Sequence, residues 1–415
     1  MTKSNFTLLQ YIVLSIIFFN IIAVIRFPGF IFSERYNYFI QISIFFLITF
    51  MNLDLNGLLR FNGLKFSILN LLSFAIIISF FLSSLYFNLS NNLDFLSLVK
   101  LATFPIIVYF FFIYIPRIIY HRQGLFEKLL NYWLYFSLSS IFVSLLVLLT
   151  GLDVFQYSAH STVGFFYYTN IFAFIFTFTI PILVYKYFTK QLSILPFLIC
   201  LIPSFICLLF TFSRAGYIGA LIGLIVLIYK KSRTLFVVTT LFLLLISSTI
   251  VIQFASAKGS ASAFSRAQVM LTGYDMIINH GATNLLWGYG VLNSKKVFVQ
   301  ELTSNFDVTR EETGPHNFVL TLGIQFGMIL TTSVLFYIFI LLLKSQLKVK
   351  RKLILSQYFK VNLALSVTLG ILTQCVMEDI VVYPEFFVMP MFLLFLGYLN
   401  LYINDNMMEI NEETA

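Results

Sequence analysis

The stretch NFVLTLGIQFGMILTTSVLFYIFILLL, residues 317–343, contains no charged side chain. A helix needs about 20 apolar residues to cross the hydrocarbon layer of a bilayer, so this stretch is long enough to do so. The whole chain has a similar character: 60% of its 415 residues are hydrophobic, 10% are charged, and the mean hydropathy is +0.93. Soluble domains carry about 25% charged residues. A core of this size could not bury so much apolar surface, so lipid must cover the rest and the chain is a polytopic membrane protein.

The sequence predicts an all-α fold with about 12 transmembrane helices. The expected spans are 8–25, 37–53, 66–87, 98–116, 130–150, 165–185, 192–212, 215–229, 234–256, 317–343, 360–377 and 381–401. The first is too long for a cleaved signal peptide and lacks a small-residue cleavage site. The predicted domains are helices 1–9 in residues 1–256, a large extracytoplasmic loop at 257–315, helices 10–12 in 316–404, and a cytoplasmic acidic tail at 405–415.

Lysine and arginine predict the orientation, because they concentrate in cytoplasmic loops. With the N terminus inside, 17 of the 26 basic residues fall in cytoplasmic segments and nine in outer segments. Both termini are therefore expected in the cytoplasm. The net charge of +9 reflects this topology and gives no indication of nucleic acid binding.

Cysteine usage and the standard motifs indicate neither a metal nor a nucleotide cofactor. Cys200, Cys207 and Cys375 all lie in expected spans, where they are read as small buried hydrophobic residues. The chain has no His/Cys/Asp cluster at metal-ligand spacing and no phosphate-binding glycine loop. No cofactor is expected.

The outer loop 257–315 is long enough to be functional, and it carries a helical pattern. Phe264, Ala267, Leu271, Tyr274 and Ile278 recur at helical spacing with polar residues between them. This pattern predicts an amphipathic helix lying in the headgroup plane. The sequence LLWGYGV at 285–291 follows as a glycine-broken turn, whose aromatic residues could lie at the interface or stack on sugars.

The loop ends in TGPHN, where Pro315 suits the first turn of a helix and places His316 in that turn at the outer end of the tenth span. Gly323 returns to the face of His316 and Gly327 lies one turn further, so a second helix can approach closely there. These positions turn His316 toward the bundle. A histidine that caps the helix or reaches the headgroups is the alternative.

A second candidate lies in FTFSRAGYIGALIG, residues 210–223, where Arg214 occupies the turn between two expected spans on the outer side. Ala215, Gly219 and Gly223 share one face and predict close helix packing. Arg214 either extends outward to water or forms an anion site, since a guanidinium matches phosphate oxygens.

Further polar residues share the outer side. They are Arg266 and Arg310 in the loop, Asn317 beside His316, Glu378 and Asp379 between the last two spans, and Asn170 inside the sixth span. Local hydrogen bonding is the alternative for Asn170, Glu378 and Asp379. An outer-face reaction has no ATP, so its substrate must arrive activated on a lipid, as a polyprenyl-diphosphate sugar does. Arginines would stabilise the charge on the leaving diphosphate, and His316 would take the proton of the attacking hydroxyl.

The order SRAG, a long outer loop with an arginine and GYG, then HN and LGIQFG resembles the O-antigen ligase/polymerase family. The resemblance is best over about residues 160–345. It implies a glycosyltransferase of the bacterial inner membrane that uses a glycan on undecaprenyl diphosphate, without nucleotide sugar or metal. Arg214 and Arg266 would hold the diphosphate and His316 would assist the acceptor hydroxyl. A flippase and a chain-length regulator would be its partners.

The family contains polymerases, which join repeat units of O-antigen, capsule or exopolysaccharide, and ligases, which pass finished chains to lipid A core. Acidic residues balance the five basic residues of loop 257–315, whereas ligases often carry a more basic loop, so a polymerase is expected. The rival from another class is a flippase or transporter. Transporters show paired halves and a midplane site, and residues 1–160 contain no second copy of the arginine–histidine arrangement.

Overall fold

A computed structural model describes the part of the chain in which the candidate site lies. The described residues are 107–121, 123–151, 169–237, 260–279, 281–306, 314–348, 355–379, 382 and 388–413. The expected spans 8–25, 37–53 and 66–87 lie outside them, as do parts of 98–116 and most of 234–256.

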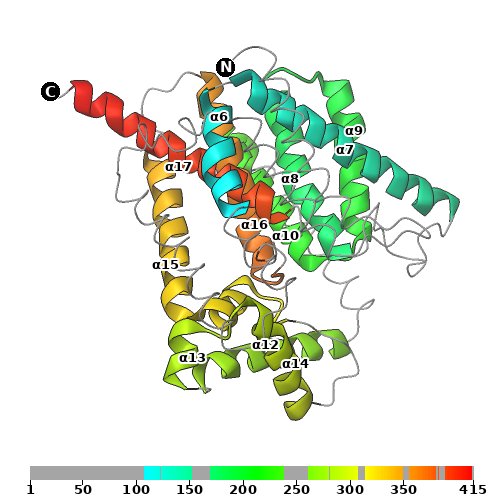
Figure 1. The fold of residues 1–415 in the computed structure, drawn as a ribbon. Coiled ribbons are helices and arrows are strands. Elements are labelled where there is room, and N and C mark those ends of the chain that lie inside the picture. The colour runs from blue at the N-terminus through cyan, green and yellow to red at the C-terminus, as the bar shows by residue number, and fades with distance from the viewer. Residues whose placement is uncertain are drawn as a thin grey trace, which may run out of the picture.

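The secondary structure of the described residues is helical, with no strand (Figure 1). The elements are η1 (Tyr109–Tyr114), α6 (Ile115–His121), α7 (Gln123–Thr150), α8 (Thr169–Phe188), α9 (Ile194–Phe210), α10 (Arg214–Lys231), α12 (Ser260–Ile278), α13 (Ala282–Trp287), α14 (Val291–Asn305), α15 (Phe318–Lys348), α16 (Leu355–Cys375) and α17 (Val388–Glu413). Much of the expected tail 405–415 is therefore a continuation of α17.

Three of these helices are long and apolar enough to cross a bilayer: Gly124–Thr150, Thr169–Phe188 and Phe318–Leu347. Shorter apolar helices run over Ile194–Phe210 and Val388–Ile403. The predicted all-α membrane fold is confirmed to this extent, and the number of 12 spans stays a prediction.

Helices α8, α10 and α16 pack closely because small residues line their contacts. A Cβ on Gly219 would lie 2.8 Å from the carbonyl oxygen of Gly370, and a Cβ on Gly370 would lie 2.7 Å from the carbonyl oxygen of Gly219. On the α8 side, a Cβ on Gly216 would lie 2.5 Å from Cβ of Ala173. The close packing predicted for the glycine face of α10 is confirmed, and it leaves no room for larger side chains there.

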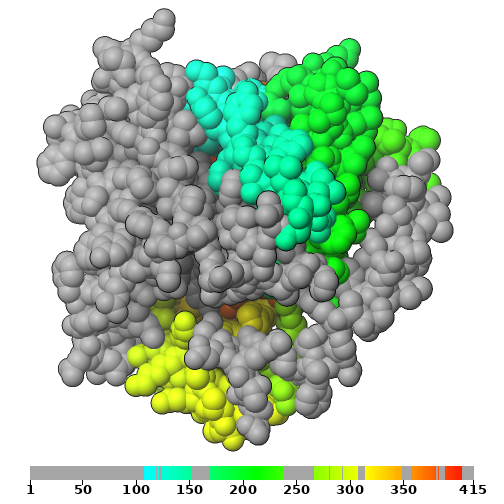
Figure 2. All heavy atoms as spheres, turned by 90° about the vertical axis from the view of Figure 1, so that its right-hand side faces the viewer, coloured from blue at the N-terminus to red at the C-terminus, as the bar shows by residue number. Residues whose placement is uncertain are grey.

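The helices alternate in direction, which gives the bundle two chemically different ends. At one end Lys186 of α8 lies 3.3 Å from Glu127 of α7, and Lys230 of α10 donates a hydrogen bond to Gln346 of α15. We call this the basic end. At the other end lie the starts of α8, α10 and α15 and the end of α16, which we call the site end. Helices α12–α14 gather at this end, at the bottom of Figure 1 and in the yellow residues at the bottom of Figure 2.

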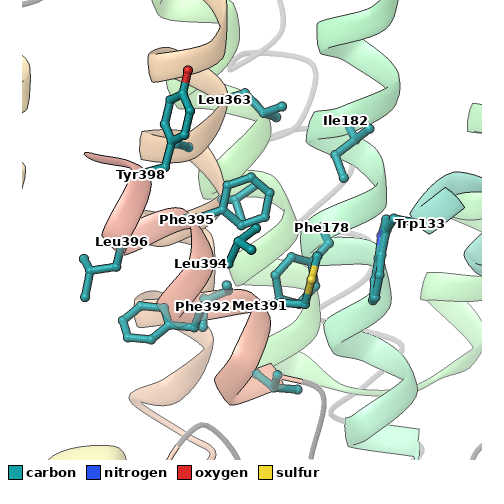
Figure 3. Close-up of a cluster of buried hydrophobic side chains, with 14 of the residues drawn as sticks. Trp133, Phe178, Ile182, Leu363, Met391, Phe392, Leu394, Phe395, Leu396 and Tyr398 are labelled. Atoms are coloured by element: carbon teal, nitrogen blue, oxygen red, sulfur yellow. The ribbon is translucent and has the colours of Figure 1, made fainter. Parts of the chain in front are cut away.

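An aromatic core joins α7, α8 and α17 between the two ends. The rings of Trp133 and Phe178 are 5.2 Å apart, and those of Phe178 and Phe395 are 6.3 Å apart (Figure 3). The indole N–H of Trp133 donates to Thr179 Oγ1 at 3.2 Å, so its polar atom is satisfied inside the bundle. The three cysteines are free, with Cys207 and Cys375 buried and Cys200 half-buried, which agrees with their prediction as small hydrophobic residues.

Helix α15 covers the span expected over 317–343, and it has a break at Gly327 that the glycine spacing alone does not predict. This residue has φ 78° and ψ 171°, which favour glycine. The break leaves helix carbonyls without their usual partners, and the GYG turn supplies new ones. The N–H of Tyr289 donates to the oxygen of Ile324 at 2.7 Å, and that of Gly290 to the oxygen of Gln325 at 2.9 Å. The turn after α13 is thereby fixed to α15 by backbone hydrogen bonds.

Candidate active site

Helix α15 begins later than expected, after Pro315 and His316 instead of at them. The helix begins at Phe318, and Asn317 is its N-cap: Asn317 Oδ1 accepts from the N–H groups of Val319 at 2.9 Å and Leu320 at 3.0 Å. His316 therefore precedes the helix instead of lying in its first turn, and it adopts a positive φ of 49°. Pro315 also lies outside the helix. The asparagine side chain outcompetes proline as the start signal because it satisfies helix N–H groups that proline cannot.

The segment that follows α16 packs on this helix start. Asn317 Nδ2 donates to the carbonyl oxygen of Val376 at 2.7 Å. The hydroxyl of Thr321 donates to Asp379 Oδ2 at 3.0 Å, and His316 Nδ1 lies 4.0 Å from Asp379 Oδ1. The imidazole thus faces a buried carboxylate at ion-pair range, slightly beyond hydrogen-bond length. Asp379 is held in place by Thr321, and it can in turn orient the imidazole.

An arginine from α12 reaches the neighbouring carboxylate. Arg266 Nη2 lies 3.3 Å from Glu378 Oε1; the arginine side chain is 42% exposed and the glutamate side chain 3%. Burial raises the pKa of Glu378 to about 7, while the positive charge of Arg266 and the nearby His316 lower it and Asp379 raises it further. Arg266 therefore contacts a carboxylate that titrates near neutrality, and the exposed part of its side chain is accessible to a ligand.

Close packing brings α12 to this position. A Cβ on Gly273 would lie 2.8 Å from Pro315 Cβ, and a Cβ on Gly323 would lie 2.7 Å from Ile277 Cδ1. The expected role of Gly323, which is to allow another helix to approach, is confirmed, and that helix is α12. Gly327 plays the same part for α13, since its Cβ would collide with the carbonyl group of Leu286.

The other predicted residues are placed less centrally. Arg214 is the first residue of α10, exposed, after the N-cap Ser213, whose side chain accepts from Gly216 N–H at 3.2 Å. Asn170 is the second residue of α8 and is half-buried. Both helices start at the site end, but neither side chain makes a hydrogen bond or ion pair with the His316 cluster among the described residues. Arg310 lies outside the described residues.

Two residues at the site end were not singled out from the sequence. Thr321 fixes Asp379, as described above, and Thr177 of α8 donates to Gln374 Oε1 of α16 at 2.7 Å. Each is a polar residue inside an apolar helix, which is the available signal. No spacing rule links either to its partner, because the partners are 58 and 197 residues away. Over the described residues, no group of three or more His, Cys, Asp or Glu side chains is placed to hold a metal ion.

The fold and the site together define an all-helical membrane protein with a histidine, an arginine and two buried carboxylates at one end of its bundle. Residues 198–335 match the family model described as O-antigen ligase. This match confirms the resemblance to the O-antigen ligase/polymerase family and supports a membrane enzyme of that type; members of the family are glycosyltransferase-like enzymes that act on lipid-linked glycans. The matched range includes Arg214, Arg266, His316 and Asn317 and ends before Glu378. No curated protein sequence matches the chain.

Asn317 performs two tasks that substitution can separate. Asn317→Ser retains a capping oxygen but cannot reach Val376, whereas Asn317→Ala loses both, at a cost of about 1 kcal/mol for the cap. We expect hydrogen exchange to accelerate at residues 376–379 in both variants, and at the start of α15 in the alanine variant alone. Equal exchange at 376–379 in wild type and Asn317→Ser would contradict this role of the amide.

Proposed function

We propose that the protein is a polysaccharide polymerase that joins undecaprenyl-diphosphate-linked repeat units at the outer face of the inner membrane. The observation that carries the proposal is the convergence of His316, Asp379, Arg266 and Glu378 at the site end. A base oriented by a carboxylate, beside a half-exposed guanidinium, matches what glycosyl transfer from a diphosphate requires.

The arginines hold the leaving group in this mechanism. Arg266 would present its open side to the diphosphate, and Arg214, exposed at the start of α10 on the same end of the bundle, would supply a second guanidinium. A guanidinium binds two phosphate oxygens at once, and the negative charge that develops as the sugar departs strengthens that interaction.

His316 receives the proton. The acceptor hydroxyl oxygen attacks the anomeric carbon of the donor sugar, the bond from that carbon to the diphosphate oxygen breaks, and undecaprenyl diphosphate leaves. The hydroxyl proton passes to the imidazole of His316, and the carboxylate of Asp379, 4.0 Å away, stabilises the resulting positive charge. Thr321 maintains Asp379 in that position, and Asn317, which holds Val376, keeps the carboxylate segment against α15.

A ligase is the second candidate, since the matched family is described as O-antigen ligase. The polymerase is preferred because acidic residues balance the basic residues of the loop 257–315. The product of such an enzyme would be a capsule, an exopolysaccharide or an O-antigen. Purified enzyme in liposomes distinguishes the candidates: lengthening of lipid-linked glycan indicates a polymerase, and transfer to added lipid A core indicates a ligase. Movement of substrate across the bilayer without new glycosidic bonds would identify a flippase instead.

We also propose that the basic end faces the cytoplasm, with both termini, and that α12–α14 form the extracytoplasmic loop. Ala267, Leu271, Tyr274 and Ile278 of α12 all point outward and are exposed, while the opposite face of this helix packs on α15. An uncovered apolar face on a helix at the end of a membrane bundle suits the interfacial layer of the bilayer. It would hold Arg266 at the depth where the diphosphate of a lipid-linked donor lies. A flippase that delivers the donor and a chain-length regulator are partners consistent with this location.

Loss of the proposed base or of the arginine at the start of α10 should strongly reduce polymer formation. His316→Ala and Arg214→Ala are each expected to lower the transfer rate about 100-fold or more, without changing the amount of protein in the membrane. Arg214→Lys should retain part of the activity, because a lysine keeps the charge and loses the fork. Gels measure the length of the polymer, and immunoblots of membranes measure the amount of protein. Arg233→Ala, at an exposed arginine of the basic end, is the control, and long polymer in the double alanine variant would refute the assignment.

Donor binding should depend on pH through Glu378. A diphosphate bound at Arg266 brings negative charge to Glu378 and raises its pKa further above 7, so binding takes up a proton. The affinity for a short polyprenyl diphosphate should therefore fall as pH rises from 7 to 9, by at most about tenfold per pH unit. Glu378→Gln stays neutral and should flatten this dependence. Titration calorimetry measures both, and an identical slope in the variant would exclude Glu378 as the group responsible.

The orientation can be tested by labelling at an exposed residue of α14. Lys295→Cys, in a background with the three native cysteines replaced by alanine, should react with an impermeant maleimide in spheroplasts. Lys190→Cys, in the turn at the basic end, is the matched control and should react after lysis. The reverse pattern would invert the proposed topology.

A further inference from the structure

A cluster of buried charges occupies the basic end, where α7, α8 and α16 meet. Glu127 of α7 lies 3.3 Å from the ammonium of Lys186 on α8 and 4.0 Å from that of Lys360 on α16. The lysine side chains are 4% and 6% exposed, and the glutamate side chain is 24% exposed. Ionisable groups inside a membrane bundle are costly, so their presence away from the candidate active site calls for a function.

The hydrogen bonds of this cluster are distributed unequally between the two lysines. Tyr185 OH donates to Glu127 Oε1 at 2.5 Å, and Lys186 Nζ donates to Glu127 Oε2 at 3.3 Å and to Gln191 Oε1 at 2.7 Å. Both carboxylate oxygens of Glu127 therefore accept hydrogen bonds from residues other than Lys360. Over the described residues Lys360 donates no hydrogen bond, and its other neighbour is the ring of Phe126, at 5.8 Å from the ammonium.

Charge neutrality is also incomplete. Among the residues that the structure describes, the two ammonium groups share one carboxylate, which leaves one positive charge in a site that is nearly closed to water. A buried charge without full pairing is unfavourable, and an incoming anion would relieve that cost. The partly exposed Glu127 marks the side from which the cluster can be reached.

We propose that Lys360 and Lys186 form a binding site for a phosphate group, supplied by the headgroup of an anionic phospholipid in the leaflet at the basic end. Lysine binds phosphate as a point charge with three donors, and Lys360 has those donors available. The cytoplasmic leaflet is rich in anionic lipid, and basic pockets between helices on that side bind such headgroups. The lipid would join α7, α8 and α16 at the end opposite the active site. The proposal rests on the orientation given above and is independent of the reaction.

The site can be tested on purified, delipidated full-length protein in a nonionic detergent at constant ionic strength. Thermal unfolding is followed while short-chain phosphatidylglycerol, phosphatidylcholine or inorganic phosphate is added. We expect phosphatidylglycerol to raise the melting temperature with a saturable dose response. Lys360→Met should weaken the apparent affinity about tenfold or more, whereas Lys360→Arg should preserve it. Lys344→Met, at a half-buried lysine near the same end of α15, is the matched control and should change the affinity less than about twofold.

Glu127→Gln distinguishes a phosphate-binding site from an ion pair that only stabilises the fold. Loss of the competing carboxylate should tighten phosphatidylglycerol binding, because the cluster then carries two uncompensated charges. An equal response to phosphatidylcholine, an unchanged affinity in Lys360→Met, or a weaker one in Glu127→Gln would overturn the proposal. A response to inorganic phosphate of the same size, with the same dependence on Lys360, would assign the phosphate group to a free anion instead of a lipid.

Discussion

The amide of Asn317 joins two segments that are 59 residues apart in the chain. Its oxygen caps α15 and its nitrogen holds the carbonyl of Val376, so one side chain fixes both the start of the helix and the segment that carries Glu378 and Asp379. His316 precedes the cap directly. The distance between the imidazole and the Asp379 carboxylate therefore depends on this hydrogen-bonded junction, and the geometry of the candidate active site depends on it in turn.

Backbone hydrogen bonding explains how the loop helices reach that junction. In an apolar environment a broken helix must find new partners for its carbonyl groups. The GYG turn provides them at the break of α15, and small residues at Gly273, Gly323 and Gly327 let α12 and α13 approach the helix backbone. Arg266 is carried to Glu378 by this packing. The arginine is thus positioned by a helix that bears an exposed apolar face on its opposite side.

The described bundle contains charge clusters at its two ends with different balances. At the site end, Arg266 and His316 face two buried carboxylates, and the burial of Glu378 brings its pKa close to neutrality, so the charge of this carboxyl group depends on pH near 7. At the basic end, two lysines share one carboxylate and leave an excess of positive charge. Between them lies the aromatic core of Trp133, Phe178 and Phe395 (Figure 3). The two clusters are thus separated by apolar packing, which keeps their charges apart.

The membrane environment, the helical class and the candidate site residues follow from the amino-acid sequence alone. Composition alone implies lipid, and the glycine spacing over 215–223 predicts close packing against a helix that it does not name. The polar residues near 214, 266, 316 and 378 stand out because the background is apolar. Tertiary structure decided the pairings. It placed Asp379 beside His316 and Glu378 beside Arg266, moved His316 out of the first turn of α15, and broke that helix at Gly327. These contacts join segments that are distant in sequence, and their partners are selected by the packing of helices, which local periodicity does not encode.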